Sequence, residues 1–309
     1  MANLVMEIAG VEFKTPLINA SGPKDESFLE LETLGKSQSA AIMMKSCTVN
    51  PRTGNVEPRF WTNGETAIQC MGLPNLGYKA YGEFIAELRK FNKPIIASVS
   101  GESPEENAMM VKLFQEAGAD LIEVNLSCPN IPGRPQVAYD LEQTEANLKA
   151  ITGLGSVPIG LKLPPFYSQV HIKEYAEVLL KSEIRFISTI NSIGNTLVID
   201  PETERSVVKP NNGLGGLSGP FIKPVALSNV RMFYQAFRGE IQIFGVGGVS
   251  SGTDVLEFML AGADAVQAGI VFWNEGPDCF ARINKEFDEL LDRKGYMAAR
   301  DLVGKLRDY

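Results

Sequence analysis

Short apolar runs alternate with longer amphipathic stretches along nearly the whole chain. Eight runs are almost continuous in apolar residues, as in parallel strands that are covered on both faces. These runs are Leu17–Ala20, Ala40–Met44, Pro94–Val99, Leu121–Leu126, Val157–Leu163, Phe186–Ile190, Ile241–Val246 and Ala265–Gly269. The intervening amphipathic segments predict helices at Ser103–Ala117, Leu141–Thr152, Gln169–Lys181 and Gly252–Ala261. This alternation predicts an α/β fold, a (β/α)8 TIM barrel rather than an open doubly wound sheet.

Two local signals refine the expected barrel. Ser103 followed by Pro104 and, three residues after the serine, by Glu106 is typical of a helix start. The opening stretch Val5–Pro16 predicts a small β-hairpin across the bottom of the barrel. No linker rich in Ser, Gly and Pro divides the sequence, so we expect one domain over residues 1–309, with insertions at the carboxyl ends of the strands.

Polar residues and glycines gather where the predicted strands end. Barrel enzymes build their active sites at the carboxyl ends of the strands, so this clustering predicts a site there. The residues concerned are Ser21-Gly22, Lys45-Ser46, Ser100-Gly101, Asn125 to Cys128, Lys162, Asn191-Ser192, Gly247-Gly248 and Gly269.

Composition narrows the class of protein. The chain has 309 residues, with 29 Lys and Arg against 37 Asp and Glu and a formal net charge of -8. This excess of acidic residues argues against nucleic acid or an anionic membrane as the main partner. No run of about 18 apolar residues is present, and the first residues lack the layout of a signal peptide, so we expect a cytoplasmic protein and no membrane partner.

Cysteine and histidine usage limits the chemistry. The four cysteines form no CxxC pair, so neither an iron–sulfur cluster nor a zinc ribbon is predicted in this chain. The single histidine, His171, falls in a predicted helix and is expected on the surface, so no metal site is predicted. Cys47, Cys70 and Cys279 are expected to be buried thiols. Cys128 differs because it stands at a strand end, beside an expected mobile loop at Asn130–Ala138, where its thiolate could accept a proton.

Three further features suggest a bound ligand. The turn Gly245–Val249, followed by a helix from Gly252, could bind a phosphate together with Gly269, although paired tight turns would look the same. Lys45 and Lys162 end apolar strands, where a lysine needs an anionic or electron-rich partner or could form a Schiff base. The side chains of Asn125, Asn130, Asn191 and Gln69 suit a planar ligand that carries amides.

Several motifs together resemble dihydroorotate dehydrogenase, over essentially the whole chain. They are NLSCPN at 125–130, AYD at 138–140, ASG at 20–22, KS at 45–46, MGLPN at 71–75, GLKLPP at 160–165, NSIGN at 191–195, GVGG at 245–248 and KGY to GKL at 294–306. Cysteine at position 128 is similar to the class 1 enzymes, because the quinone-using class has serine there. The quinone-using class also has an N-terminal helical extension. NSIGN, DPE at 200–202 and IKPVALSNVR at 222–231 are similar to the homodimeric, fumarate-using class 1A branch.

The resemblance implies a mechanism. Dihydroorotate would stack on the flavin of FMN, Cys128 would take the C5 proton, and C6 would deliver hydride to the flavin. Lys162 would stabilise the negative charge of the reduced flavin. Fumarate would then reoxidise the flavin in the same site. The product, orotate, belongs to pyrimidine biosynthesis.

The resemblance also implies two sets of binding residues. The substrate residues would be Lys45, Gln69, Cys70, Met71, Gly72, Leu73, Asn125, Asn130, Asn191 and Ser192. The FMN residues would be Ala20, Ser21, Gly22, Lys45, Ser46, Asn125, Lys162, Ile190, Gly219, Gly247, Gly248, Gly269 and Ile270.

The chain departs from the family pattern at two places. Gln69-Cys70 stands where related enzymes have Asn-Ser, and Ile270 stands where they have a threonine beside the phosphate. Gln69 keeps the amide but lengthens its reach by one methylene, so we expect Gln69→Asn to tighten dihydroorotate binding. Ile270 removes one hydroxyl and keeps its backbone N–H.

Four alternatives stay open on the sequence. A class 1B-like enzyme would pass electrons to NAD through an iron–sulfur partner subunit. A related flavoenzyme would act on another cyclic amide, which Gln69 motivates. A flavin-free barrel lyase would use Lys162 as a Schiff base, and a non-catalytic module would bind flavin without turnover.

Overall fold

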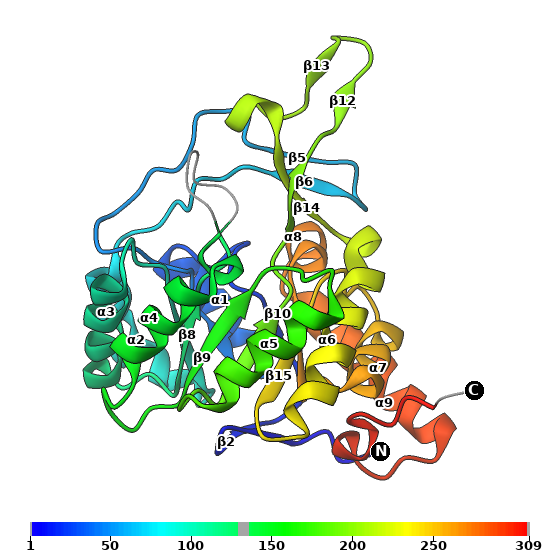
Figure 1. Cartoon of the computed structure of the whole chain (residues 1–309). Coiled ribbons are helices and arrows are strands. Elements are labelled where there is room, and N and C mark those ends of the chain that lie inside the picture. Colours follow the sequence, from blue (N-terminus) through cyan, green and yellow to red (C-terminus); the bar gives the residue numbers. More distant parts are fainter. Residues whose placement is uncertain (1, 129–135, 308–309) are drawn as a thin grey trace.

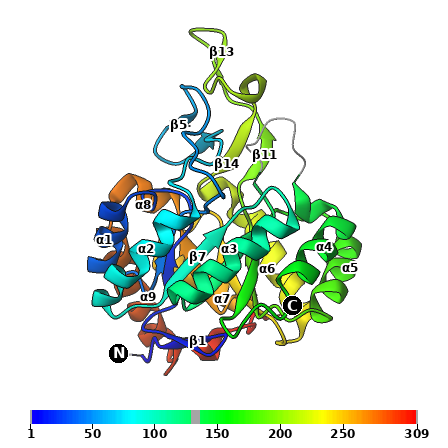
Figure 2. The ribbon, with the colours of Figure 1, turned by 90° about the vertical axis from the view of Figure 1, so that its left-hand side faces the viewer.

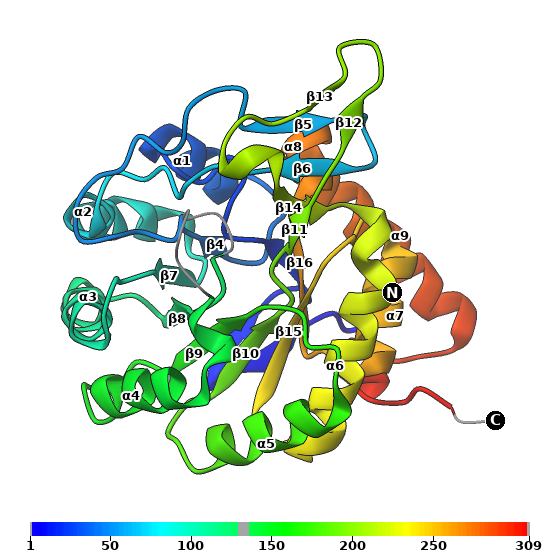
Figure 3. The same cartoon turned by 45° about the horizontal axis from the view of Figure 1, so that its top comes forward.

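Eight parallel strands form a barrel at the centre of the computed structural model, which describes residues 2–128 and 136–307 (Figures 1 and 3). Each strand lies within one of the eight predicted runs, so the predicted (β/α)8 barrel is confirmed. The strands are β3 (Leu17–Asn19), β4 (Ile42–Met43), β7 (Ile95–Val99), β8 (Leu121–Asn125), β9 (Ile159–Leu163), β10 (Phe186–Thr189), β15 (Gln242–Val246) and β16 (Ala265–Ala268). Their hydrogen-bonded order runs β3-β16-β15-β10-β9-β8-β7-β4.

A side-chain amide helps to close the barrel between its two outer strands, β3 and β4. The backbone N–H of Ala40 donates to the Leu17 carbonyl at 2.9 Å. The buried side chain of Asn19 accepts from the Met43 N–H at 3.0 Å and donates to the Met43 carbonyl at 2.8 Å. Asn19 therefore supplies the donor and the acceptor that a neighbouring strand would present, and satisfies a backbone pair that would otherwise be buried without partners.

Helices surround the barrel (Figure 3). The α-helices are α1 (Phe28–Lys36), α2 (Tyr78–Leu88), α3 (Pro104–Ala117), α4 (Leu141–Ile151), α5 (Gln169–Leu180), α6 (Lys223–Phe237), α7 (Gly252–Ala261), α8 (Ile270–Glu275) and α9 (Asp278–Lys294). Single 3-10 turns are η1 (Arg89–Phe91), η2 (Val137–Tyr139), η3 (Asn211–Gly213), η4 (Pro220–Ile222) and η5 (Ala299–Leu302). The predicted start of α3 is confirmed, because the Ser103 side chain accepts from the Glu106 N–H. No helix in the described ranges is long and apolar enough to cross a membrane.

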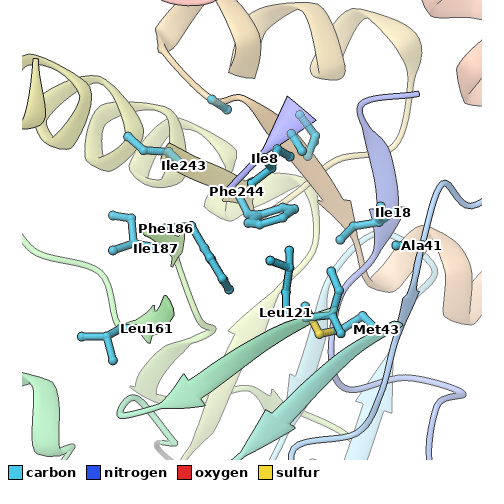
Figure 4. Packing of buried hydrophobic residues seen from close by; sticks show 14 of the residues in the cluster. Ile8, Ile18, Ala41, Met43, Leu121, Leu161, Phe186, Ile187, Ile243 and Phe244 are labelled. Atoms are coloured by element: carbon cyan, nitrogen blue, oxygen red, sulfur yellow. The ribbon is translucent and has the colours of Figure 1, made fainter. Parts of the chain in front are cut away.

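Aromatic packing fills the end of the barrel where the strands begin (Figure 4). The rings of Phe186 and Phe244 lie 5.3 Å apart, edge to face. Gly160 on the neighbouring strand leaves room for Phe186, because a Cβ at this position would overlap the ring. Phe13 packs on Phe244 at 6.0 Å, so the hairpin of β1 (Met6–Ile8) and β2 (Val11–Phe13) covers this end. The predicted hairpin across the bottom is therefore confirmed.

A second sheet stands over the opposite end of the barrel (Figures 1 and 2). Its strands are β5 (Phe60–Thr62), β6 (Ala67–Gln69), β11 (Ile193–Thr196) and β14 (Gly215–Ser218), in the order β11-β14-β6-β5. A small hairpin of β12 (Ile199–Asp200) and β13 (Arg205–Ser206) projects beyond it. The sheet combines an insertion after β4 with one after β10, which confirms the predicted insertions at the carboxyl ends of the strands.

Candidate active site

A cavity of about 750 Å³ lies between the carboxyl ends of the barrel strands and the second sheet. Both layers contribute to its wall, so residues from distant parts of the sequence face one another. The predicted site residues that line it are Ala20, Ser21, Gly22, Lys45, Ser46, Gln69, Met71, Leu73, Asn125, Cys128, Lys162, Ile190, Asn191, Ser192, Gly219, Gly247, Gly248, Gly269 and Ile270. Asn130 and most of the predicted loop lie outside the described residues.

Two predicted substrate residues, Cys70 and Gly72, do not line the cavity. Gln69 faces the cavity, and side chains alternate along an extended segment, so the next side chain turns away. Cys70 is instead buried against Ile68 and Val208 in a small apolar cluster. Gly72 has a φ of 71° and lies against Asn55, where a Cβ would overlap the Asn55 side chain.

The other thiols behave as buried side chains, as predicted. Cys47, Cys70 and Cys279 are buried, whereas Cys128 is half-buried and lines the cavity. Burial raises the pKa of Cys47 and of Cys70, and raises the pKa of Cys279 to about 12. These three thiols therefore stay protonated near neutral pH. His171 is exposed on α5, also as predicted.

A cluster of hydroxyl groups around Ser46 joins four strand ends on the cavity floor. The Ser46 hydroxyl contacts the hydroxyls of Ser21 at 3.1 Å and Ser98 at 2.8 Å, and it accepts from the Asn125 amide at 3.1 Å. The Ser46 N–H donates to the Ser21 hydroxyl at 2.8 Å. Hydroxyls can rotate to donate or accept, so this floor can adapt to a polar ligand while its backbone stays fixed.

A chain of amides continues from this floor along one wall of the cavity. The side-chain Oδ1 of Asn125 accepts from the Ser127 N–H at 3.1 Å and from the Ser127 hydroxyl at 3.0 Å. Asn191 donates to the Ser127 hydroxyl at 3.0 Å and accepts from the Ser192 N–H at 2.8 Å. Gln69 then donates to the Ser192 hydroxyl at 3.2 Å. Each amide is thus held by its neighbour, which fixes the orientation of the wall before any ligand binds.

Lys162 extends into the cavity from β9 and is only 4% exposed. Its ammonium donates to Gln267 at 3.2 Å, and Gln267 donates to Ser188 at 3.1 Å. Burial lowers the pKa of Lys162, while the negative charges of Glu123 and Asp25 oppose that shift. The net direction is a lowered pKa, because burial outweighs the two carboxylates that favour the charged form.

Glu123 is a functional candidate that the sequence reasoning missed. It is fully buried on β8, and one of its carboxylate oxygens accepts from the Ser98 hydroxyl at 3.1 Å. Glu123 precedes Asn125 by two positions on the same strand, so both side chains point into the barrel. The signal in the sequence is a glutamate inside the otherwise apolar run Leu121–Leu126, two positions before Asn125.

Glycines shape the part of the cavity predicted to bind a phosphate. Gly248 has a φ of 78°, and a Cβ there would lie 2.9 Å from the Gly219 carbonyl oxygen. Gly219 has a φ of 103°, and a Cβ there would overlap the Glu65 carbonyl oxygen. Only glycine fits these two positions, so their backbone faces the cavity without side chains.

The helix that exposes its first turn to this region is α8 rather than α7. The sequence predicts this role for the helix that starts at Gly252, but N–H groups at the start of α7 donate to side chains of the protein itself. The Gly252 N–H donates to Glu286 at 2.8 Å, and Ser251 and Asp254 form a capping box. In contrast, Ile270 and Val271 begin α8 and line the cavity. The first N–H groups of a helix lack partners within it and suit an anion.

Residues 3–291 match the protein family described as dihydroorotate dehydrogenase. The chain belongs to the dihydroorotate dehydrogenase family. It is 44% identical over 303 residues to "Dihydroorotate dehydrogenase A (fumarate)" of Lactococcus lactis subsp. cremoris, with 97% of each chain covered. It is 42% identical over 309 residues to "Probable dihydroorotate dehydrogenase A (fumarate)" of Enterococcus faecalis, with 99% of each covered. The predicted A branch of the family is thereby confirmed.

A solved structure supports the same fold at lower identity. The crystal structure of DHODH from Eimeria tenella, in complex with ferulenol, matches with a TM-score of 0.82 and 21% identity. The match covers 98% of this chain and 88% of the other. A likeness at this identity shows that the barrel is shared.

An aromatic pair at the cavity wall of this dihydroorotate dehydrogenase family member was not predicted. Phe60 on β5 and Trp273 on α8 both line the cavity, with ring centroids 4.8 Å apart. The Lys24 ammonium lies 5.8 Å from the Trp273 ring centroid. These residues are far apart in sequence and meet because β5 packs against α8 in the folded chain. No local pattern in the sequence could have linked them.

Proposed function

We propose that this protein oxidises dihydroorotate to orotate, with FMN as the cofactor and fumarate as the final acceptor. The dihydroorotate dehydrogenase family is flavin-dependent in general. FMN, when bound, supplies the hydride acceptor for the substrate and the hydride donor for fumarate. The observation that carries the proposal is that Cys128, Lys162 and the amide wall all line one cavity.

The residues present fit a flavin nucleotide. The cavity of about 750 Å³ lies within the range usual for cofactor sites. Gly269 opens onto free space, since a Cβ there would meet only the Ala20 Cβ, at 3.8 Å. The backbone at Gly247, Gly248 and Ile270 would hold the phosphate, and Ser21, Ser46 and Ile190 would contact the rest of the nucleotide.

The remaining wall would hold the substrate. Asn125, Asn191 and Ser192 would bond the ring amides, and Lys45 would bind the substrate carboxylate. Cys128, as thiolate, would take the proton from C5. The positive charge of Lys162 would stabilise the negative charge that develops during reduction.

An anaerobic visible spectrum before and after addition of dihydroorotate tests the proposal. Bleaching of a bound flavin band is the expected result, because the first half-reaction needs no second substrate. Addition of fumarate should then restore the band. A yellow protein that stays yellow with dihydroorotate would point to another cyclic amide as substrate. Recovery with NAD only in the presence of a second subunit would contradict fumarate as the acceptor.

We also propose that residues 1–309 work as one FMN-binding unit and that the protein is a cytoplasmic homodimer. Sedimentation equilibrium measures the oligomeric state directly. A single species with twice the 33.7 kDa chain mass is the expected result.

The substitution Gln69→Asn is expected to tighten dihydroorotate binding. The Gln69 side chain donates to the Ser192 hydroxyl and accepts from the Met71 N–H at 3.3 Å, so both ends of its amide are bonded to the protein. The shorter asparagine would leave its amide available to the substrate. The Kd from titration of the flavin spectrum measures the change. An unchanged or weaker affinity in the variant would count against this role for position 69.

The substitution Gly269→Ala is expected to weaken flavin binding by about tenfold, equivalent to roughly 1.4 kcal/mol. Its added methyl would enter the cavity beside the predicted phosphate position and meet little protein. Gly248→Ala provides the contrast, because it adds a methyl where the protein itself is in the way. We expect the first variant to keep its thermal midpoint and the second to lose several degrees. If Gly269→Ala binds flavin as tightly as the original protein does, the phosphate does not lie beside Gly269.

A further inference from the structure

A buried carboxylate lies directly behind the cavity wall, beside Lys45. Asp25 is fully buried and is not among the residues that line the cavity. One carboxylate oxygen accepts from the Gly22 N–H at 2.7 Å. The other has no hydrogen-bond partner among the described residues and lies 4.0 Å from the Lys45 ammonium.

Asp25, Gly22 and Lys45 hold one another in place. The Lys45 ammonium donates to the Gly22 carbonyl at 2.7 Å, and the Lys45 N–H donates to the Asp25 carbonyl at 3.2 Å. Lys45 and Gly22 both line the cavity, and Lys45 is 8% exposed. The Asp25 carboxylate thus holds Gly22 in the turn after β3 and Lys45 after β4, and it does so from behind the cavity wall.

Several charges face the Asp25 carboxylate from the elements around it. Burial is the largest influence and raises the pKa of Asp25 to about 6, with Glu26 and Glu30 at the start of α1 adding to the shift. Lys45 and the Gly22 N–H oppose it. Lys162 on β9 and Tyr81 on α2 also feel the charge of Asp25. Asp25 therefore changes its charge within the range in which enzymes are commonly assayed.

We propose that Asp25 is a positioning residue whose charge sets how strongly Lys45 binds a substrate carboxylate. This inference rests on the proposed function, which assigns the substrate carboxylate to Lys45. With Asp25 protonated, the ammonium has no competing carboxylate. With Asp25 ionised, the same ammonium is shared between Asp25 and the substrate. Affinity for the carboxylate should therefore be highest below pH 6 and fall as the pH rises through about 6.

Orotate is a suitable probe because it binds without being oxidised and its carboxylate is ionised throughout this range. Isothermal titration calorimetry of the FMN-loaded protein from pH 5 to 7.5 measures its affinity. We expect the original protein to lose about tenfold in affinity over that range, comparable to one pKa unit of interaction. Asp25→Asn should keep the affinity of the acidic form at every pH, within about twofold. An asparagine oxygen can still accept from the Gly22 N–H, so the turn is preserved.

Asp264→Asn is the matched control. Burial also raises the pKa of Asp264 to about 6, but its carboxylate holds the Ile243 N–H at 2.8 Å at the amino end of β16 and does not line the cavity. This variant should keep the pH dependence of the original protein. If Asp25→Asn keeps it as well, the inference is overturned. If orotate fails to bind the original protein at any pH, the proposed function fails instead, and the inference with it.

Discussion

Replacement of Cys128 by alanine is expected to slow reduction of the bound flavin by dihydroorotate by roughly 10²–10⁴-fold, the usual contribution of a positioned general base. The thiol is half-buried and lines the cavity together with Lys162. The single histidine lies exposed on α5, so it is not placed to take over the proton transfer. Stopped-flow absorbance under anaerobic conditions measures the rate, and the flavin content of the purified variant should be unchanged.

Two further variants make this result specific. Cys128→Ser should retain some reduction, mainly at high pH, because a serine hydroxyl ionises far less than a cysteine thiol near neutral pH. Cys279→Ala removes a buried thiol on α9 that does not line the cavity, and should leave the rate unchanged. Full activity in Cys128→Ala would remove this residue from the mechanism.

The barrel itself was predictable because its strands are buried on both faces. Such strands are continuous in apolar residues, and the polar residues that follow them mark the strand ends without any knowledge of tertiary structure. Lys162 and Asn125 could be placed in one site for this reason, since the carboxyl ends of barrel strands meet at one face. The side chain of Asn19, which helps to close the barrel, gave no comparable signal.

Other parts of the site depend on contacts that no local pattern contains. The second sheet pairs β6 with β14, from insertions more than a hundred residues apart. Phe60 and Trp273 are also far apart in sequence and meet only where β5 packs against α8. Cys70 was included because it is adjacent to Gln69 in a motif, and adjacency in a strand places side chains on opposite faces. Asp25 was missed because its burial beside the Lys45 ammonium, twenty positions further along the sequence, arises only in the folded barrel.

Replacement of Lys162 by methionine should affect stability as well as activity. Lys162 and Glu123 are almost completely buried, and the charge of Glu123 raises the pKa of Lys162 against the effect of burial. Removal of the ammonium leaves the buried Glu123 carboxylate without the positive charge of Lys162 nearby. No direct ion pair joins the two side chains in the described structure, so we expect a loss below the about 3–5 kcal/mol of a broken buried salt bridge. Urea unfolding of flavin-free protein measures this cost, because bound flavin would add its own binding free energy to the stability.

A second substitution separates the two effects of Lys162. Glu123→Gln in the methionine variant removes the unopposed charge and keeps an oxygen that can accept from the Ser98 hydroxyl. We expect the double variant to regain most of the lost stability, which a double-mutant cycle records as an interaction energy between the two sites. Reduction of the flavin should stay slow, because no cation remains at the Lys162 position to stabilise the developing negative charge. The cycle also needs the single variant Glu123→Gln. If the stability losses of the two single variants simply add in the double variant, Glu123 and Lys162 do not act as a pair, and the buried carboxylate has another role.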